Sequence, residues 1–384
     1  MKILFDDVAF DQSPYSGVSR YLTQIIANLP PQAMSTLPIL ETSNIYLQLP
    51  PFNIPVARHS FQTFFPQTPF PGKRRIFNLL SRLAFPLFPT AERRNRNEFY
   101  RLLHLLDFDI LHLTSAHYYG THWKDCIGKR PIIVTLHDVI PEKLLHQQDA
   151  ERERRRIIRC ATRFIAVSET TKRDFIGLYG VPEEKVDVVY HGPSYSFPVR
   201  NEPLFPWPYL LYVGKRNGYK NFRFFVRAIA PWLQARTQFR LVCTGRPFNP
   251  DEIRLLNGLR IANRCIARFV PEEDMGTLYH HAFAFVYPSR YEGFGIPILD
   301  AFESGCPTIL NNASCFPEIG GDAALFFEDG NAASLLDALV KLEVDSEFRN
   351  RLSKAGKTRA RLFSWKTAAE QTFRSYERAI RDFL

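Results

Sequence analysis

Cysteine is scarce in this sequence, and its spacing argues against two classes of protein. The 384 residues include no C-x-x-C pair and only six cysteines: Cys126, Cys160, Cys243, Cys265, Cys306 and Cys315. Several stand in apolar sequence, as in LVCTG around Cys243, where a free thiol behaves as a small buried hydrophobic group. This usage favours a reducing compartment over a disulfide framework or a zinc site. No cluster of metal-ligating residue types is visible, so we expect no bound metal.

Long hydrophobic runs are also missing. No uninterrupted apolar stretch reaches the roughly 18 residues that a transmembrane helix needs. The first ten residues, MKILFDDVAF, place Asp6 and Asp7 where a secretion signal requires an apolar run. We therefore expect a cytoplasmic protein without a transmembrane helix.

The composition has no low-complexity tract and is that of a globular chain, with 45% hydrophobic and 23% charged residues. A chain of 384 residues exceeds what one hydrophobic core usually holds, which predicts two domains. The net charge of +10 is compatible with nucleotide phosphates, anionic lipids or nucleic acid as partners. No stretch interleaves basic and aromatic residues as nucleic-acid motifs do, so we expect no nucleic-acid partner.

Strand patterns alternate with helical patterns along the chain. We expect one strand ending at Tyr287 and others over 2–9, 110–113, 132–136, 164–167, 186–190, 209–213, 239–244 and 264–269. The all-apolar strand 132–136 is typical of a parallel sheet buried on both faces. The alternation predicts an α/β fold with two doubly wound parallel-sheet domains. Prolines concentrate between the two halves, and from them we place the boundaries: a first domain at 1–197, a linker at 198–208, a second domain at 209–364 and a C-terminal helix at 365–384.

The most informative stretch is VYPSRYEGFGIPILDAFESG, which covers 286–305. It predicts a buried strand, a short loop and a helix. Pro297 suits the first turn of that helix, where a missing N–H costs nothing, and Gly305 suits the left-handed position after its last turn.

The loop in this stretch immediately precedes the helix N-terminus, whose unpaired amides can bind an anion or sugar hydroxyls. Its residues are Glu292, Gly293, Phe294 and Gly295. Asp300 returns one helical turn later. The spacing alone also fits an ordinary strand-to-helix turn with a solvated glutamate.

A basic glycine turn, GKRNGYKNF, follows the strand 209–213. Backbone amides, the start of the next helix and the charges of Lys215, Arg216 and Lys220 suit this turn to phosphate. A basic surface turn without a ligand is the alternative.

In the first half of the chain, His137 and Asp138 follow the strand 132–136 at its carboxyl end. Open α/β sheets bind their ligands at this end of the strands. The pair is therefore a candidate site, with a structural histidine as the alternative.

Together these motifs resemble those of retaining glycosyltransferases with the GT-B fold, of the group 1 or family 4 type. EGFGIPILDAFESGCP resembles the family's Glu-x7-Glu motif, in which the first carboxylate and the next amides hold the donor sugar and the second carboxylate binds ribose. The resemblance gives the sugar-holding roles to Glu292, Gly293, Phe294, Gly295 and Ile296. The shorter Asp300 stands in the second position, and Glu303 on a neighbouring helix face is an alternative ribose ligand.

Other stretches carry the same resemblance. SGVSRY resembles the family's Gly-Gly-x-x-Arg-Tyr loop against the donor diphosphate and acceptor, where Gly17 matches the second glycine and Arg20 the arginine. In the basic turn Lys220 matches a family lysine that binds the diphosphate. For the accompanying arginine we prefer Arg216 to Lys215, because a planar guanidinium grips phosphate better.

His137 resembles the family's histidine near the donor sugar, which stabilises the reacting centre or the acceptor. We assign its neighbour Asp138 to acceptor binding. AVSETTKRDFIGLYGV, at 166–181, matches a further passage at the end of the family's N-terminal domain.

The resemblance implies a GT-B architecture, with two Rossmann-like domains facing across a cleft. It implies transfer of a hexose, with mannose favoured, from a nucleotide diphosphate sugar to a hydroxyl of a glycan or lipid-linked acceptor, with retention and without a metal or other cofactor. Three rival functions are a GT-B nucleotide-sugar epimerase, a Rossmann oxidoreductase and a non-catalytic basic binding scaffold. The missing G-x-G-x-x-G fingerprint disfavours the oxidoreductase.

Residues 73–97 mix basic and apolar positions, beginning KRRIFNLLSRL. Such a segment could lie on the anionic inner face of a membrane as a peripheral contact. The alternative, which we favour from the sequence, is a pair of helices with one packed face and solvated arginines.

Overall fold

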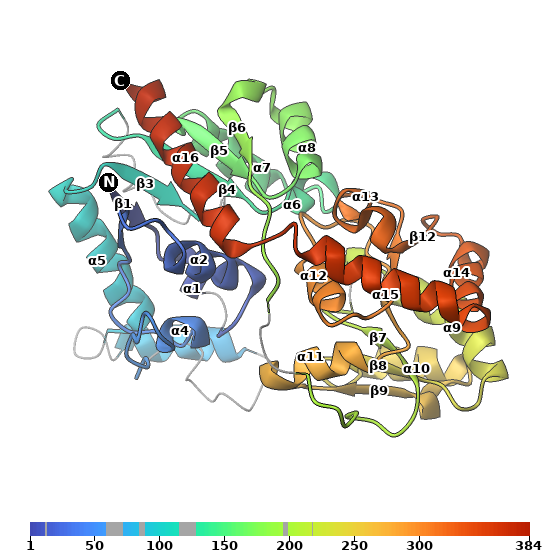
Figure 1. Cartoon of the computed structure of the whole chain (residues 1–384). Helices are drawn as coiled ribbons and strands as arrows, with labels where there is room; N and C mark the ends of the chain where they lie inside the picture. Colours follow the sequence, from blue (N-terminus) through green and yellow to red (C-terminus); the bar gives the residue numbers. More distant parts are fainter. Residues whose placement is uncertain (12–13, 59–71, 84–88, 115–127, 195–198, 217) are drawn as a thin grey trace. The chain divides into compact units, whose positions relative to one another are not determined.

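A computed structural model describes residues 1–11, 14–58, 72–83, 89–114, 128–194, 199–216 and 218–384. Two compact units make up the chain (Figure 1). The first consists of Met1–Val167, Lys172–Val189 and Trp365–Leu384, and the second of Ser168–Thr171 and Tyr190–Ser364. Each unit has its own parallel sheet and its own hydrophobic core.

The sheet of the first unit has six strands in the order β2-β1-β3-β4-β5-β6, all of them parallel. Its strands are β1 (Lys2–Phe5), β2 (Met34–Thr36), β3 (Ile110–Leu113), β4 (Ile132–Leu136), β5 (Arg163–Ala166) and β6 (Val186–Val188). The residues of β3, β4 and β5 are all buried, which for β4 confirms the prediction from its all-apolar sequence of a strand covered on both faces. The order reverses between β1 and β3, so the loops after these two strands flank the ligand-binding edge of a doubly wound sheet.

The first unit also contains helices, and the last one comes from the end of the chain. They are α1 (Val8–Asp11), α2 (Gly17–Ala27), α3 (Ile45–Gln48), α4 (Lys73–Leu83), α5 (Ala91–Leu105), α6 (Ile140–Lys143), α7 (Gln148–Ile158), α8 (Glu169–Tyr179), a 3-10 turn (Glu183–Lys185) and α16 (Trp365–Phe383). The first turn of α8 falls in the second unit. Helix α16 packs against α2, β4 and β5 and buries Tyr376 and Ala379 completely in the first core.

The first strand is shorter than the sequence predicts. A strand over 2–9 was expected, but β1 ends at Phe5 and α1 begins at Val8. The cause is Asp6, whose Oδ1 accepts the N–H of Val8 at 3.3 Å and whose Oδ2 accepts the N–H of Thr114 at 3.0 Å. A carboxylate that bonds its own backbone two residues on turns the chain and ends the strand.

The second unit repeats the architecture with the strand order β12-β11-β10-β7-β8-β9. All neighbours are again parallel. The strands are β7 (Tyr209–Tyr212), β8 (Arg240–Thr244), β9 (Cys265–Arg268), β10 (Ala284–Tyr287), β11 (Thr308–Asn311) and β12 (Leu325–Phe327). The order reverses between β7 and β10, which makes the loops after these two strands neighbours at the carboxyl edge of the sheet.

The helices of this unit include the one predicted after the EGFG sequence. They are 3-10 turns at Gly218–Lys220, Ala262–Arg264 and Gly321–Ala323, with α9 (Phe222–Ala235), α10 (Pro250–Gly258), α11 (Glu272–His280), α12 (Ile296–Glu303), α13 (Phe316–Gly320), α14 (Ala332–Val344) and α15 (Ser346–Ala360). As predicted, Pro297 lies in the first turn of α12 and Gly305 is left-handed with φ +70°. Across the described helices of both units, none is both long and apolar enough to cross a membrane.

Candidate functional site

The switch point of the second unit brings the basic turn and the acidic turn together. Lys220 Nζ lies 2.6 Å from Glu292 Oε1 and 3.3 Å from the hydroxyl of Tyr287. The Lys220 and Glu292 side chains are only 15% and 11% exposed. The two turns also bond through their backbones, because the N–H of Arg290 donates to the carbonyl of Tyr219 at 2.8 Å. Residues 72 positions apart thus form a half-buried ion pair at the carboxyl ends of β7 and β10.

The EGFG turn directs its carbonyl groups into the protein. Four acceptors are bonded in this way: Glu292 O by Ser314 Oγ, Gly293 O by Ser168 Oγ and Thr171 Oγ1, Phe294 O by Cys315 Sγ, and Gly295 O by the N–H of Ile298. Among the described residues no acceptor is bonded to the N–H groups of Gly293, Phe294, Gly295 and Ile296. N–H groups that are unbonded in this way at the start of α12, an eight-residue helix, carry partial positive charge suited to an anion or to hydroxyl oxygens.

Glycine is required at position 295 to form this turn. Gly295 caps α12 with φ +88°, in the left-handed region. A Cβ there would lie 3.1 Å from Ile298 Cδ1 and 3.3 Å from Phe316 Cε1. The neighbouring Phe294 ring is buried against His191, with ring centroids 4.5 Å apart. Phe294 therefore offers a ligand its backbone, while its ring anchors the turn in the core.

The two carboxylates considered for the ribose lie in different environments. Asp300 is 5% exposed, and its Oδ1 accepts the N–H of Ser194 at 2.6 Å. Glu303 is exposed in the last turn of α12, about 4.5 Å farther along the helix axis at 1.5 Å per residue.

The basic turn is shaped by Tyr212, the last residue of β7. Its hydroxyl donates to the carbonyls of Lys215 at 2.7 Å and Lys220 at 3.3 Å. Lys215 itself is exposed. Arg216 is held more firmly, because its Nε lies 3.0 Å from Glu252 Oε1 and its Nη2 donates to the carbonyls of Arg246 and Pro247. Its guanidinium also stands 4.9 Å over the ring of Phe248.

In the first unit, His137 follows β4 at the carboxyl end of the strand, as predicted. Its Nε2 lies 3.0 Å from the carbonyl oxygen of Thr114, which can only accept, so Nε2 carries the proton and Nδ1 a lone pair. The ring of Tyr21 meets it edge-on at 5.1 Å. Burial lowers the pKa of His137 to about 4; the Thr114 bond opposes this effect and the charge of Arg154 adds to it. The imidazole is therefore neutral at neutral pH.

The other first-unit candidates lie near the ends of helices. Asp138 is half-buried, and its Oδ1 accepts the N–H of Ile140 at 2.9 Å ahead of α6. Gly17 is the first residue of α2, and no atom lies within 4 Å of where a Cβ would be. Arg20 is 6% exposed; it donates to the hydroxyl of Tyr46 at 2.6 Å and stands over that ring at 4.7 Å.

Sequence reasoning gave no site role to Asp6, which lies at the switch point of the first sheet. The side chain is fully buried, and Thr114 donates to it with both its N–H and its hydroxyl. Burial above all raises the pKa of Asp6 to about 7; the charge of Asp7 adds to the rise and the Thr114 bonds counteract it. Its position at the carboxyl end of the first strand was the available signal.

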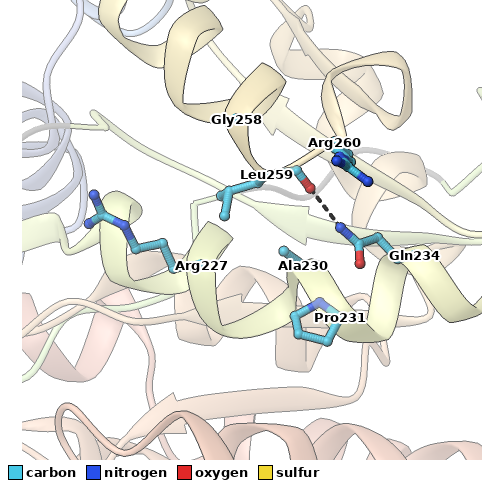
Figure 2. A pocket seen from close by; sticks show the side chains of 7 residues that line it. All are labelled: Arg227, Ala230, Pro231, Gln234, Gly258, Leu259 and Arg260. Atoms are coloured by element: carbon cyan, nitrogen blue, oxygen red, sulfur yellow. Dashed lines mark hydrogen bonds between the residues drawn. The ribbon is translucent and has the colours of Figure 1, made fainter.

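A cavity of about 480 Å³ lies elsewhere on the second unit, between α9 and the end of α10 (Figure 2). It is lined by Arg227, Ala230, Pro231, Gln234, Gly258, Leu259 and Arg260. The Gln234 side chain donates to the carbonyl of Leu259 across it at 2.8 Å. No residue of the basic or acidic turn lines this cavity. The described residues also contain no group of three or more His, Cys, Asp or Glu side chains that could hold a metal.

Comparison with known proteins agrees with this architecture. The family "Glycosyl transferases group 1" matches residues 205–359 and "Glycosyltransferase Family 4" matches residues 57–196. The chain is 28% identical over 268 residues to O-antigen chain mannosyltransferase B of Escherichia coli, an alignment covering 64% of this chain and 70% of that protein. It is 27% identical over 180 residues to O-antigen chain mannosyltransferase RfbU of Salmonella typhimurium, covering 47% and 50%.

Solved structures share the fold over nearly the whole chain. Anabaena HepE, solved in complex with UDP and glucose, superposes with a TM-score of 0.70 at 19% identity and covers 98% of this chain and 99% of its own. Sucrose-phosphate synthase from Thermosynechococcus elongatus gives a TM-score of 0.67 at 18% identity, with 98% of each chain covered. Two family matches that follow one another along the chain, on two parallel six-stranded sheets, agree with the motif resemblance. The chain belongs to the glycosyltransferases of the GT-B fold.

Proposed function

We propose that this glycosyltransferase moves a hexose, with mannose favoured, from a nucleotide diphosphate sugar to a hydroxyl of a glycan or lipid-linked acceptor, with retention and without a metal. The observation that supports it most is the group of four N–H groups at the start of α12 that are unbonded among the described residues, beside the Lys220–Glu292 ion pair. The names of the relatives support mannose, since both aligned proteins are called mannosyltransferases. HepE was solved with UDP and with UDP-glucose, which supports the class of donor.

We assign the residues that act on the donor from the negative charge that develops on its diphosphate. The bond between the anomeric carbon and the phosphate oxygen breaks, the acceptor oxygen bonds to that carbon, and its proton leaves with the nucleotide diphosphate. Lys220 and the N–H groups at the start of α12 would stabilise the charge that develops on the diphosphate, and stabilisation of this kind usually contributes more to catalysis than any other effect. We assign the remaining phosphate charge to Lys215 or Arg216, with Arg216 requiring its contact with Glu252 to loosen.

The sugar and ribose contacts follow from the carboxylates. Glu292 would accept hydrogen bonds from sugar hydroxyls once the diphosphate competes for Lys220. Asp300, which is buried and accepts a backbone N–H, is a better ribose ligand than the exposed Glu303, because its position is fixed before the donor binds.

We assign His137 to the reacting centre or the acceptor. A neutral imidazole with a lone pair on Nδ1 can face an oxocarbenium-like carbon without the repulsion that an imidazolium would cause. Asp138, Gly17 and Arg20 belong to the same proposal as acceptor or diphosphate contacts of the first unit. The carboxylate of Asp138 can accept hydrogen bonds from the hydroxyls of a polyol or glycan acceptor, and the guanidinium of Arg20 can donate to them.

A thermal-shift screen tests the proposal, with GDP-mannose, UDP-glucose and ADP-glucose each supplied in EDTA. A donor at 100 times its Kd stabilises the native state by about 2.7 kcal/mol, which raises Tm by roughly 5 to 10 °C for a unit of this size. The donor that raises Tm is then incubated with acceptor glycans, and the anomeric configuration of the product is read by NMR.

Three results would contradict the proposal. They are a Tm unchanged by every nucleotide sugar, a product of inverted configuration, and turnover that requires an added divalent cation. Conversion of the donor sugar to a free isomer without acceptor would identify an epimerase instead.

A further inference from the structure

Helix α4 exposes the apolar face that an amphipathic helix normally buries. Ile76, Leu79 and Leu80 are 44%, 58% and 47% exposed. Their spacing of three and four residues places them on one face of the helix. Phe77, about 100° around the helix from Ile76, is half-buried. Among the described apolar side chains of α4, three are therefore exposed and one is partly covered.

The next helix shows what ordinary packing looks like in this part of the chain. In α5 the residues Ala91, Asn95, Phe99 and Leu103 are each at most 2% exposed, and they recur every four residues. Helix α5 is thus the packed helix that the sequence allowed for 73–97, although its arginines are only partly solvated. Arg93 and Arg101 are exposed, while Arg94 and Arg96 are half-buried and pair with Glu41 and Asp7. Helix α4 is not packed in this way, so the two helices of this segment have different roles.

The charge of this segment indicates which kind of partner could cover the exposed apolar face of α4. The sequence has no Asp or Glu between Glu41 and Glu92, while the same stretch contains Arg58, Lys73, Arg74, Arg75 and Arg82. Arg75 is exposed on α4 itself. A second copy of the chain would bring two equally basic helices together, which like-charge repulsion disfavours. An anionic surface with an apolar interior matches both the charge and the exposed side chains.

We propose that α4 docks the first unit on a membrane rich in anionic lipid, with Ile76, Leu79 and Leu80 inserted below the headgroups and Arg75 among the lipid phosphates. Eleven residues measure about 16 Å, half of the roughly 30 Å of a hydrocarbon core. The helix therefore lies in the plane of the interface. This docking does not depend on which sugar the enzyme transfers, so it can fail while the proposed reaction holds.

Vesicle flotation with the full chain tests the docking. Wild type should float with vesicles of phosphatidylcholine and phosphatidylglycerol, remain at the bottom with phosphatidylcholine alone, and be released by salt. The combined variant Ile76→Ser, Leu79→Ser, Leu80→Ser should bind at least about tenfold more weakly, because it removes the inserted apolar area. Arg75→Glu should weaken binding by roughly fivefold or more, since each basic residue near the surface contributes about that factor.

The matched control removes exposed apolar side chains from the second unit. Val344 and Leu362 are 75% and 68% exposed, so Val344→Ser with Leu362→Ser changes the same chemistry at another place and should float like wild type. A Leu80→Trp variant reports insertion directly, because its emission should shift to the blue when anionic vesicles are added.

Several outcomes would overturn the proposal. Absence of flotation with anionic vesicles, equal flotation of the triple serine variant, or an unshifted Leu80→Trp emission would each do so. If the triple variant instead converts a dimer to a monomer in sedimentation while vesicles bind neither form, the face is a contact between copies of the chain. If native-state protection of α4 from hydrogen exchange matches that of α5 without vesicles, another segment of the chain covers the face.

Discussion

The ion pair between Lys220 and Glu292 allows stability and chemistry to be separated by experiment. The two charged atoms are 2.6 Å apart, and both side chains are largely shielded from water. Lys220→Met keeps the aliphatic stem but leaves the Glu292 carboxylate half-buried without its cation. Breaking a buried pair from one side costs about 3 to 5 kcal/mol, because the remaining charge is uncompensated.

The magnitude expected here lies at the lower end of that range. The Tyr287 hydroxyl stays beside the pair, and the remaining exposure lets water solvate part of the carboxylate. A loss of about 3 kcal/mol corresponds to a Tm lower by roughly 6 to 12 °C for a unit of 150 to 250 residues. Adding Glu292→Gln to Lys220→Met removes the orphaned charge and should restore most of this loss.

Catalysis should behave differently from stability. If Lys220 stabilises the leaving diphosphate, Lys220→Met lowers the transfer rate by about 10²-fold or more, and the double variant that folds normally stays equally slow. Unfolding is followed by urea titration, donor affinity by calorimetry and transfer by product formation. Lys354→Met on α15 serves as a control, because Lys354 lies outside the basic and acidic turns. A double variant that regains the wild-type transfer rate would refute the reasoning, as would a Lys220→Met variant with unchanged stability and rate.

Three further predictions concern the turn, the buried titratable groups and the metal. Gly295→Ala should lose about 1 to 3 kcal/mol of stability in urea titrations and weaken donor binding, because φ +88° is strained for alanine and the Cβ meets Ile298. Burial lowers the pKa of His112 to about 3. Below about pH 6.5 the histidine is therefore protonated in the unfolded chain but not in the native one. Because of this difference, the free energy of unfolding should fall by up to about 1.4 kcal/mol for each pH unit as the pH is lowered from about 6 to 4. His112→Gln should remove that part of the slope. Transfer activity should be equal in EDTA and in Mg²⁺.

Each of these predictions has its own control. Gly17→Ala has open space around the new Cβ and should leave stability nearly unchanged, so an equal loss at both glycines would contradict the strain argument. Burial raises the pKa of Asp6 to about 7. Its contribution to the free energy of unfolding therefore has the opposite pH dependence to that of His112 and is lost as the pH rises from about 4 to 7. Asp6→Asn should therefore steepen the acid-side slope, and an unchanged slope in both variants would contradict the linkage. A rate restored only by added metal after EDTA would contradict metal independence.

Much of the fold could be predicted from local sequence. The all-apolar run 132–136 identified a doubly buried parallel strand, and Pro297 and Gly305 identified the two ends of α12. These features depend on backbone conformation and on burial of whole segments, which neighbouring residues largely determine. The same local reasoning extended β1 to residue 9 because it missed the turn that Asp6 makes with the N–H of Val8. The bond from Thr114, 108 positions away, which holds the Asp6 side chain in place, could not be foreseen locally.

Within the second unit, only the tertiary structure could decide that the acidic and basic turns share one site. Their meeting depends on β7 and β10 being neighbours across a reversal of strand order, which no local pattern encodes. It likewise decided that Arg216 is engaged by Glu252, that Asp300 rather than Glu303 is buried, and that α4 shows its apolar side to solvent while α5 hides its own. The sequence by itself determined which residues could bind phosphate, sugar or lipid. Which groups these residues contact, and how exposed they are to water, is decided by long-range packing, because residues far apart in the chain exclude water from one another.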